Sequence, residues 1–342
     1  MFQRTLILVT TCLLGASANA DPKLRFDATP IVAGYITVVP TAINDHGVVI
    51  GGLGDEWPFQ PFKFSDGVME SLPVSEGLAL DINDRGDIIV QFYLAGSDSG
   101  YLLRGSVPIR LQTESGQPFY VSGLNNRGVV VGSVIQNFSL GSYAASWSNG
   151  VVRALSPISH DGGYSASDIN DSGVAVGTMS KTPFSLVMAA MFREGQTIPL
   201  GTLTGSAGSL AKAINSHGDV LCIAYSPGLQ GAKTFLVRAG GGILDIGGLP
   251  GATTVYGQGM NNLGQIVGYV EDAGGRQRAF LYMDDVMYDL TEFIKPTSGW
   301  TFLTANAIND KGQIAGIGQE NGGGHTAFLL TPQKTTKHRP SL

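Results

Sequence analysis

The chain has 342 residues, including 48 glycines, with 43% hydrophobic and 14% charged residues, which is the composition of a turn-rich globular protein and not of a disordered one. Its formal net charge of -6 argues against nucleic acid as a partner, because phosphate binding needs clustered lysine and arginine. After residue 20 no run of 18 uninterrupted apolar residues occurs, so we expect no membrane span.

The first 20 residues, MFQRTLILVTTCLLGASANA, have the layout of a cleavable secretory signal: a short segment with Arg4, an apolar core and a small-residue site before Asp21. We therefore expect cleavage at about Ala20 and a secreted or periplasmic protein. Of the two cysteines, Cys12 lies in this signal and only Cys222 remains, so an intramolecular disulfide is excluded. The predicted organisation is a signal peptide (1–20), one domain (21–332) and a polar tail (333–342).

One short motif recurs along the mature chain. The seven copies are AINDHGVVIGG, DINDRGDIIVQ, GLNNRGVVVGS, DINDSGVAVGT, AINSHGDVLCI, GMNNLGQIVGY and AINDKGQIAGI, with asparagines at 44, 83, 125, 170, 215, 261 and 309. The asparagines are 39 to 48 residues apart, and repeats with periods in this range are typical of solenoids and propellers.

A second piece, between the motifs, consists of two apolar runs joined by a turn. It reads PFKFSDGVMESL, GYLLRGSVPIRL, AASWSNGVVRAL, AAMFREGQTIPL, TFLVRAGGGILDI and AFLYMDDVMYDL, and several copies carry the Asp-Gly or Asn-Gly signal of a hairpin. Each repeat therefore holds about four short strands. The sequence predicts an all-β fold, a seven-bladed β-propeller of four-stranded antiparallel blades.

The chain ends predict how the ring closes. Only one strand, HTAFLL (325–330), follows the last motif, and one strand-like piece, LRFDATPIVAGY (24–35), precedes the first. We expect the N-terminal strand to complete the last blade, because this pairing removes two exposed sheet edges. An open solenoid is the alternative, and it would need a cap at each end.

The alternation of an AINDxGxVVG core with an AFLxxxxxMxDL hairpin, clearest in RAFLYMDDVMYDL and HTAFLL, resembles the HAF family of probable extracellular repeat proteins. The resemblance covers residues 40 to 332. The name-giving His-Ala-Phe is Arg278-Ala279-Phe280 here and His-Thr-Ala-Phe at 325–328. The resemblance implies export and a repeat architecture, and it implies no reaction and no catalytic residue.

The motif itself favours a turn over a metal site. Its asparagine can accept from an amide two residues on, and its glycine can adopt the left-handed conformation of a hairpin bulge. A calcium loop starting at Asp168 would need an acid at its twelfth position, where Met179 stands. We predict no metal ion and no cofactor.

Two residues before the asparagine, the side chain is small in five copies and is Asp81 or Asp168 in the other two, which we expect to line the central channel. Four residues after the turn glycine stands another glycine, at 51, 132, 177, 268 and 316, which predicts close packing against a neighbouring blade. Cys222 takes this place in one copy and is interpreted as a buried, unreactive thiol.

Candidate ligand-binding residues lie in the loops opposite the inner turns: Trp57, His160, Asp161, Tyr164, Arg276 and Trp300. In the first hypothesis the protein is a monomeric binding or scaffold module for an extracellular glycan or protein, with the aromatic residues as stacking platforms. In the second it is an exported hydrolase or lyase, with His160 and Asp161 as acid and base. Packing of the aromatics under loops and an ordinary HDGG turn are the simpler alternatives. Because the chain has no HExxH, GxSxG, Walker or CxxC motif, we favour a non-enzymatic role.

Overall fold

A computed structural model describes residues 24–32, 37–55, 58–92, 99–137, 141–158, 162–180, 182, 186–229 and 231–333. The predicted signal peptide and residues 334–342 of the predicted tail lie outside these ranges. Within them, the only helical segments are three short 3-10 turns, η1 (Pro227–Leu229), η2 (Leu290–Phe293) and η3 (Pro296–Ser298). None of the helices described has the length and apolar character needed to cross a membrane.

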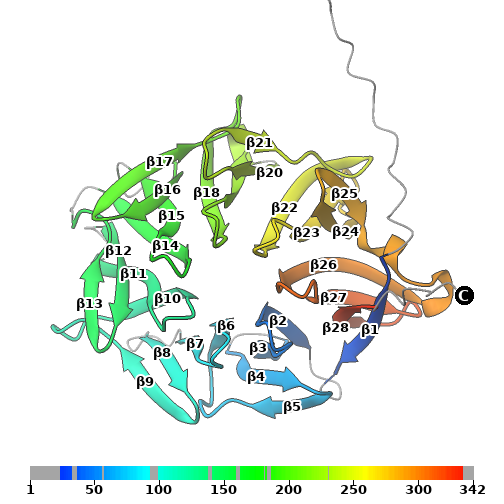
Figure 1. The fold of residues 1–342 in the computed structure, drawn as a ribbon, viewed down its shortest axis with the longest axis horizontal. Helices are drawn as coiled ribbons and strands as arrows, with labels where there is room; N and C mark the ends of the chain where they lie inside the picture. The colour runs from blue at the N-terminus through cyan, green and yellow to red at the C-terminus, as the bar shows by residue number, and fades with distance from the viewer. Residues whose placement is uncertain are drawn as a thin grey trace, which may run out of the picture.

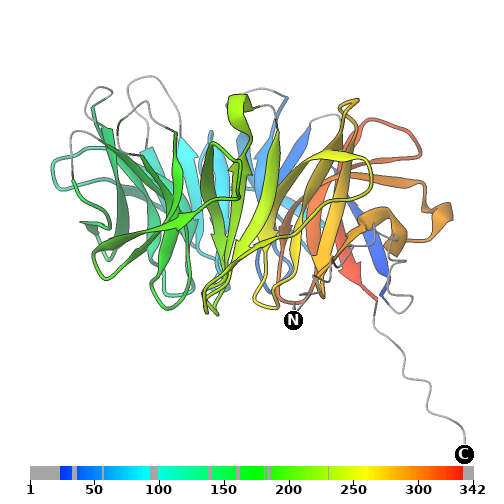
Figure 2. The ribbon, with the colours of Figure 1, turned by 90° about the horizontal axis from the view of Figure 1, so that it is seen from above.

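The described chain forms antiparallel sheets arranged radially around a central axis (Figures 1 and 2). Five sheets have four strands each. Three of them are β2 (Val38–Ile43), β3 (Val49–Leu53), β4 (Gln60–Ser65), β5 (Val68–Ser71); β6 (Leu78–Ile82), β7 (Ile88–Phe92), β8 (Ser99–Arg104), β9 (Val107–Leu111); and β18 (Gly208–Ile214), β19 (Val220–Tyr225), β20 (Ala232–Val237), β21 (Ile243–Asp245). The other two are β22 (Ala252–Met260), β23 (Ile266–Asp272), β24 (Gln277–Met283), β25 (Val286–Asp289); and β26 (Trp300–Ile308), β27 (Ile314–Glu320), β28 (His325–Pro332), β1 (Phe26–Ile31).

The remaining sheet has eight strands, where two further separate blades were predicted. Its strands are β10 (Phe119–Leu124), β11 (Val130–Asn137), β12 (Gly141–Ser148), β13 (Val151–Ala154), β14 (Gly163–Ile169), β15 (Ala175–Ser180), β16 (Met188–Arg193) and β17 (Gln196–Gly201). Its two antiparallel halves, β10–β13 and β14–β17, meet through one parallel bridge between Ser142 and Gly163. The structure therefore has five separate four-stranded blades and one double-width sheet.

The N-terminal strand β1 pairs with the C-terminal strand β28 over six residue pairs, from Phe26 opposite Pro332 to Ile31 opposite Ala327. Phe26 packs edge-on against Phe293, with ring centroids 5.9 Å apart. Ile31 is fully buried, in a cluster that also contains Phe62 of β4 and Ala327 of β28. Residues from the two ends of the chain thus share one hydrophobic core.

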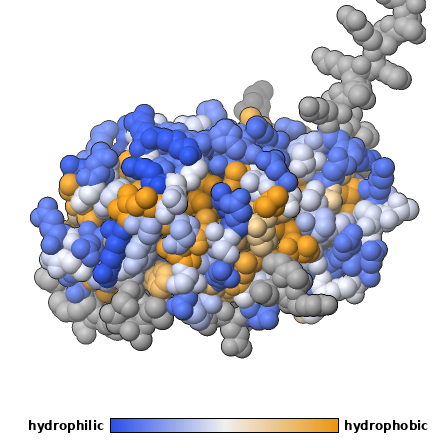
Figure 3. All heavy atoms as spheres, turned by 90° about the horizontal axis from the view of Figure 1, so that it is seen from below, coloured by the Kyte–Doolittle hydropathy of each residue, from blue (hydrophilic) through white to orange (hydrophobic). Residues whose placement is uncertain are grey.

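The outer strand pairs are the hairpins predicted from the second repeated piece. In three of them the turn begins with a residue of positive φ (Asp66, Asn149 and Glu194, 50° to 52°) followed by a glycine of positive φ. This pair of left-handed residues is the geometry of a type I′ turn, which suits the twist of the flanking strands. Apolar and polar patches alternate over the rim (Figure 3), where Val68 and Val107 are 57% and 61% exposed.

Every innermost strand carries a β-bulge near its end. The pairing register skips one residue between Pro40 and Ala42 in β2, and between Ala79 and Asp81 in β6. The same shift occurs in β10, β14, β18, β22 and β26. A bulge leaves one residue out of the ladder and turns its side chain away from the regular alternation.

The bulge also explains the second glycine of the motif, and it corrects our prediction about that position. A Cβ atom added at Gly51 would lie 2.0 Å from the Val39 carbonyl oxygen of the same blade, and one at Gly177 would lie 2.0 Å from that of Ser165. The contact that requires glycine is therefore with the adjacent inner strand, and not with a neighbouring blade.

Candidate functional site

Two cavities lie along the axis of the ring. The larger, about 640 Å³, is lined by residues of the inner strands such as Val39, Leu80 and Lys212. The smaller, about 220 Å³, lies at the hairpin turns and is lined by the repeated asparagines and the residues beside them. Asp81 and Asp168 line both cavities, and they therefore mark the place where the two meet.

The bulged residue of every inner strand lines the larger cavity. These seven residues are Thr41, Leu80, Ser122, Ser167, Lys212, Gln258 and Asn306. They stand at one level of the scaffold, one from each repeat, and they include hydroxyls, amides, an aliphatic group and an ammonium. The repeat thus presents a ring of chemically different side chains on a uniform backbone.

Asp81 and Asp168 join neighbouring repeats. One carboxylate oxygen of Asp81 accepts the Ile82 amide at 2.8 Å, and the other accepts the Leu124 amide of the next repeat at 2.8 Å. Asp168 repeats this geometry, accepting from Ile169 at 2.7 Å and from Ile214 at 2.8 Å. These side chains line the cavity and also connect blades.

The electrostatics of this region are set by burial. Desolvation raises the pKa of Asp81 to about 8, and the nearby Asp168 carboxylate adds to the rise, while the two backbone donors oppose it. Desolvation also raises the pKa of Asp168. Lys212 is exposed on the cavity wall, and the protein around it lowers its pKa by desolvation, an effect that Asp168 partly offsets. With its pKa raised to about 8, Asp81 is largely protonated at neutral pH.

At each hairpin turn the asparagine side chain accepts hydrogen bonds from its own turn. In each repeat the asparagine Oδ1 accepts the amides two and four residues on, as His46 and Val48 donate to Asn44 at 3.1 and 3.0 Å. The turn glycines have φ between 72° and 89°. The predicted structural role of the motif is therefore confirmed.

The other end of each asparagine reaches the next repeat. Nδ2 of Asn44 donates to the Asn83 carbonyl at 3.1 Å, and similar bonds run from Asn83, Asn125, Asn170 and Asn261 to the following asparagine. Asn309 donates to the Asn44 carbonyl at 2.8 Å, which joins the last motif to the first. These six bonds all run in the same direction around the axis.

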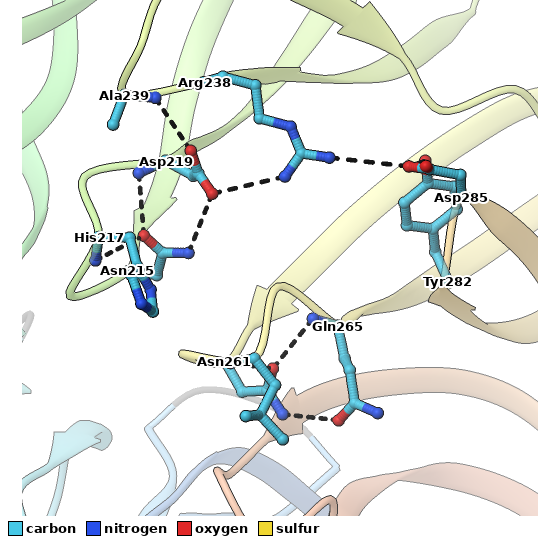
Figure 4. Close-up of polar contacts among 10 residues, drawn as sticks. Asn215, His217, Asp219, Arg238, Ala239, Asn261, Gln265, Tyr282 and Asp285 are labelled. Atoms are coloured by element: carbon cyan, nitrogen blue, oxygen red, sulfur yellow. Dashed lines mark hydrogen bonds and ion pairs between the residues drawn. The ribbon is translucent and has the colours of Figure 1, made fainter.

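Among the described residues, no such bond runs from Asn215 to Asn261, and Figure 4 shows this junction between the two repeats. The Asn215 amide instead donates to Asp219 of its own repeat at 3.4 Å. Arg238 contacts the same Asp219 carboxylate at 3.4 Å and reaches Asp285 of the next repeat at 3.7 Å. An arginine ion pair thus spans this seam, where the other seams have an asparagine link.

Acidic and amide side chains form a second set of hydrogen bonds beside the asparagines. An oxygen of Asp84 accepts the Asp45 amide at 2.9 Å, and Asp45 in turn accepts the Asp310 amide at 2.8 Å. Burial raises the pKa of Asp45, and the carboxylates of Asp310 and Asp84 raise it further. Within the described ranges, no group of three or more histidine, cysteine, aspartate or glutamate residues is arranged to hold a metal ion.

The predicted loop candidates do not form one site among the described residues. Trp57, His160 and Asp161 lie outside them. Tyr164 is half-buried in β14 and packs beside a core cluster. Arg276 is exposed in the turn between β23 and β24, where its amide donates to Asp272 at 3.0 Å.

Trp300 lies in the core and presents no open platform. It is 6% exposed and stacks on Phe302, with ring centroids 5.7 Å apart, and it meets the edge of Phe328 at 6.0 Å. An aromatic ring that is almost fully buried among core residues contributes packing energy and offers no open face to a sugar. The structure thus assigns Trp300 the packing role that the sequence left as the alternative.

Cys222 is also part of the core. It is fully buried and free, and desolvation raises its pKa to about 12. A thiol with this pKa remains protonated at neutral pH and is a poor nucleophile. The structural interpretation of Cys222 is confirmed.

Sequence reasoning missed the bulged residues. They stand three positions before each asparagine, where the sequence changes from Thr41 to Leu80 to Lys212, while the preceding position stays small or apolar and the following one is alanine, glycine or aspartate. This variation within a regular repeat was the available signal. The position was overlooked because strict strand alternation would not turn that side chain toward the axis.

No protein-family model matches the chain, and no curated protein sequence matches it. Oligogalacturonate lyase from Vibrio parahaemolyticus is structurally similar, with a TM-score of 0.57 at 9% identity over 90% of this chain and 96% of that one. YCF48 bound to D1 peptide gives a TM-score of 0.54 at 11% identity, over 94% and 98%. TolB from Acinetobacter baumannii gives 0.48 at 12% identity and covers 84% of this chain, which spans only 63% of TolB. Likeness at these identities concerns the fold alone, and with the sheet topology it makes the chain an all-β propeller of four-stranded antiparallel blades.

Proposed function

We propose that this protein is an exported binding module whose ligand, an extracellular glycan or part of another protein, enters the larger central cavity. The observation that carries the proposal is the ring of bulged side chains around the cavity. These side chains differ from repeat to repeat, although the backbone that holds them is the same in each repeat. A cavity of about 640 Å³ lies within the ordinary range for ligand pockets.

The proposal treats the molecule as a closed ring of seven repeat units, with the eight-stranded sheet counted as two joined blades. The pairing of β1 with β28 and the hydrogen bond from Asn309 to Asn44 support this closure. The resemblance to the HAF family supports export and a repeat architecture, and we propose that the protein acts as a monomer. Proteins of similar fold include one bound to a peptide and one lyase, so the architecture is compatible with binding or catalysis.

The test is to fill the cavity. Ser122→Trp places a large ring in the cavity without requiring a change in the sheet, and the mature protein is screened on a glycan array and in pull-downs from the secreting culture. Ser115→Trp, at an exposed turn, is the matched control. We expect wild type and Ser115→Trp to retain the same ligand and Ser122→Trp to lose it. A ligand that binds all three proteins equally would place the site elsewhere and overturn the proposal.

The same screen addresses the enzymatic alternative. If a glycan retained on the array is also cleaved, the exported hydrolase or lyase hypothesis replaces the binding module. His160→Ala then tests the predicted acid and base pair, because cleavage at the wild-type rate in that variant removes His160 from the mechanism.

A further inference from the structure

The wall of the larger cavity has two chemically different parts. In three adjacent repeats the bulged side chain is apolar or already satisfied: Leu80 is aliphatic, Thr41 donates to the Ala79 carbonyl at 2.7 Å, and Asn306 donates to the Pro40 carbonyl at 2.8 Å. In the four following repeats the bulged residues are Ser122, Ser167, Lys212 and Gln258. None of these four side chains has a hydrogen-bond or ion-pair partner among the residues described in the structure.

Polar groups without protein partners can exchange their water for a ligand. Each serine hydroxyl donates one hydrogen bond and accepts two, and the Gln258 amide both donates and accepts, so these side chains match the hydroxyl groups of a sugar. Lys212 offers three donors and one positive charge, and among the residues that the structure describes it is the only lysine or arginine that lines either cavity. An ammonium in this setting prefers an anionic partner.

Lys212 has no carboxylate of the protein as a direct ion-pair partner among the described residues, so it can bind an anionic ligand. Asp168 is not within ion-pair distance of Lys212, and both of its carboxylate oxygens already accept backbone amides. Asp81, on the other side of Asp168 along the ring, is held largely neutral because burial raises its pKa. A ligand carboxylate beside Lys212 would therefore meet an ammonium that has no direct ion-pair partner among the described residues.

The rest of the cavity suits the body of a sugar ring. Val39, Pro40, Leu80, Val121 and Leu210 give it apolar lining, and a pyranose ring has faces of C–H groups that pack on such surfaces. We propose that the arc formed by Ser122, Ser167, Lys212 and Gln258 binds a uronic acid unit, with the sugar carboxylate on Lys212. This proposal rests on the proposed function and names its ligand class.

The test measures calorimetric binding of the mature protein to glucuronate and galacturonate, each compared with its neutral sugar, glucose or galactose. We expect at least one acid to bind about 10-fold to 100-fold more tightly than its neutral counterpart, the range expected for one hydrogen-bonded charged group. Lys212→Met should abolish this preference. Lys233→Met, which removes an exposed lysine on β20, should leave it unchanged.

The overall affinity should also depend on the uncharged members of the arc, whereas the preference for the acid should not. Gln258→Ala should weaken the binding of the acid and of its neutral counterpart by a similar factor, because it removes an amide that hydrogen-bonds a sugar hydroxyl and removes no charge. Absence of binding by both acids, equal binding of acids and neutral sugars, or wild-type binding by Lys212→Met would overturn the proposal.

These outcomes separate the two proposals. If Ser122→Trp removes a ligand that Lys212→Met still binds, the cavity is the binding site but the ligand is not a uronic acid. If neither substitution affects the ligand, both proposals fail.

Discussion

At the residue scale, Asp81 and Asp168 show how one side chain can serve the scaffold and the cavity together. Each accepts an amide of its own repeat and one of the next repeat, so each joins two repeats through hydrogen bonds to the backbone. The other repeats carry alanine or glycine at this place. The aspartates are therefore local connections on an otherwise uniform ring.

Asp81→Asn tests the protonation of this group. Since the folded-state pKa is raised to about 8, the folded protein keeps a proton that the unfolded chain loses above about pH 4, and this group makes stability fall as pH rises through that window. Asparagine has one acceptor oxygen in place of two, so the variant should be about 1 kcal/mol less stable than wild type at pH 4.5. The deficit should shrink or reverse at pH 8.5, as measured by urea unfolding.

The control is Asp66→Asn, which removes an exposed carboxylate in a hairpin turn. Its difference from wild type should not depend on pH in the same way. A constant difference between Asp81→Asn and wild type at the two pH values would show that Asp81 is ionised in the folded protein throughout.

At the scale of the elements, the inner hairpin turn is the unit that repeats most strictly. Its asparagine satisfies two amides of its own turn and, in six repeats, one carbonyl of the next turn. Buried donors and acceptors that lose their partners cost more than the net value of the bond. The turns therefore stabilise each blade and connect it to the next.

Asn125→Ala and Asn215→Ala separate the two contributions. Both asparagines are buried and accept the amides two and four residues further along their own turn, but of the two only Asn125 has the cross-repeat bond, to the Asn170 carbonyl at 3.1 Å. Asn125→Ala should lower the free energy of unfolding by about 2–4 kcal/mol, and Asn215→Ala by about 1 kcal/mol less. Equal losses in chemical denaturation would mean that the bond between repeats contributes nothing measurable.

Much of this element level could be predicted from the sequence. The asparagine and glycine spacing identified the turns, and the Asp-Gly and Asn-Gly pairs identified the outer hairpins, because both signals are local and each depends on a few backbone angles. The bulges could not be located, since a bulge is defined by the pairing of two strands and not by one of them. Lys212 for this reason remained unnoticed, while Trp300, which sequence placed near a loop, lies in the core.

At the scale of the whole molecule, the chain ends are held in one sheet. Ile31 of β1 is fully buried against residues of the first blade and of β28, so its packing couples the beginning of the chain to its end. The neighbouring Val32 is 61% exposed. Alanine substitutions at buried Ile31 and exposed Val32 therefore measure how much the packing of β1 contributes to stability.

Ile31→Ala should lower the free energy of unfolding by about 2–4 kcal/mol, because it leaves a cavity where the first and last strands meet. Loosening of β1 would uncover the edge of β28, so we also expect self-association on heating, visible by size-exclusion chromatography. Val32→Ala should change the stability by less than about 0.5 kcal/mol. Equal, small effects of the two substitutions would show that β1 contributes little to the fold.

The hydrogen bonds between the repeated asparagines form an open series and not a closed circle. Its bonds run from Asn261 through Asn309, Asn44, Asn83, Asn125 and Asn170 to Asn215, and the seam between Asn215 and Asn261 separates the last residue from the first. This seam is held instead by the Arg238–Asp285 ion pair, by the hydrogen bonds of the Thr234 hydroxyl with Val255 and Gly257, and by a shared hydrophobic cluster. Lys212 lies on β18 beside this seam, so a ligand held by Lys212 would sit where side chains other than the repeated asparagines join the neighbouring repeats.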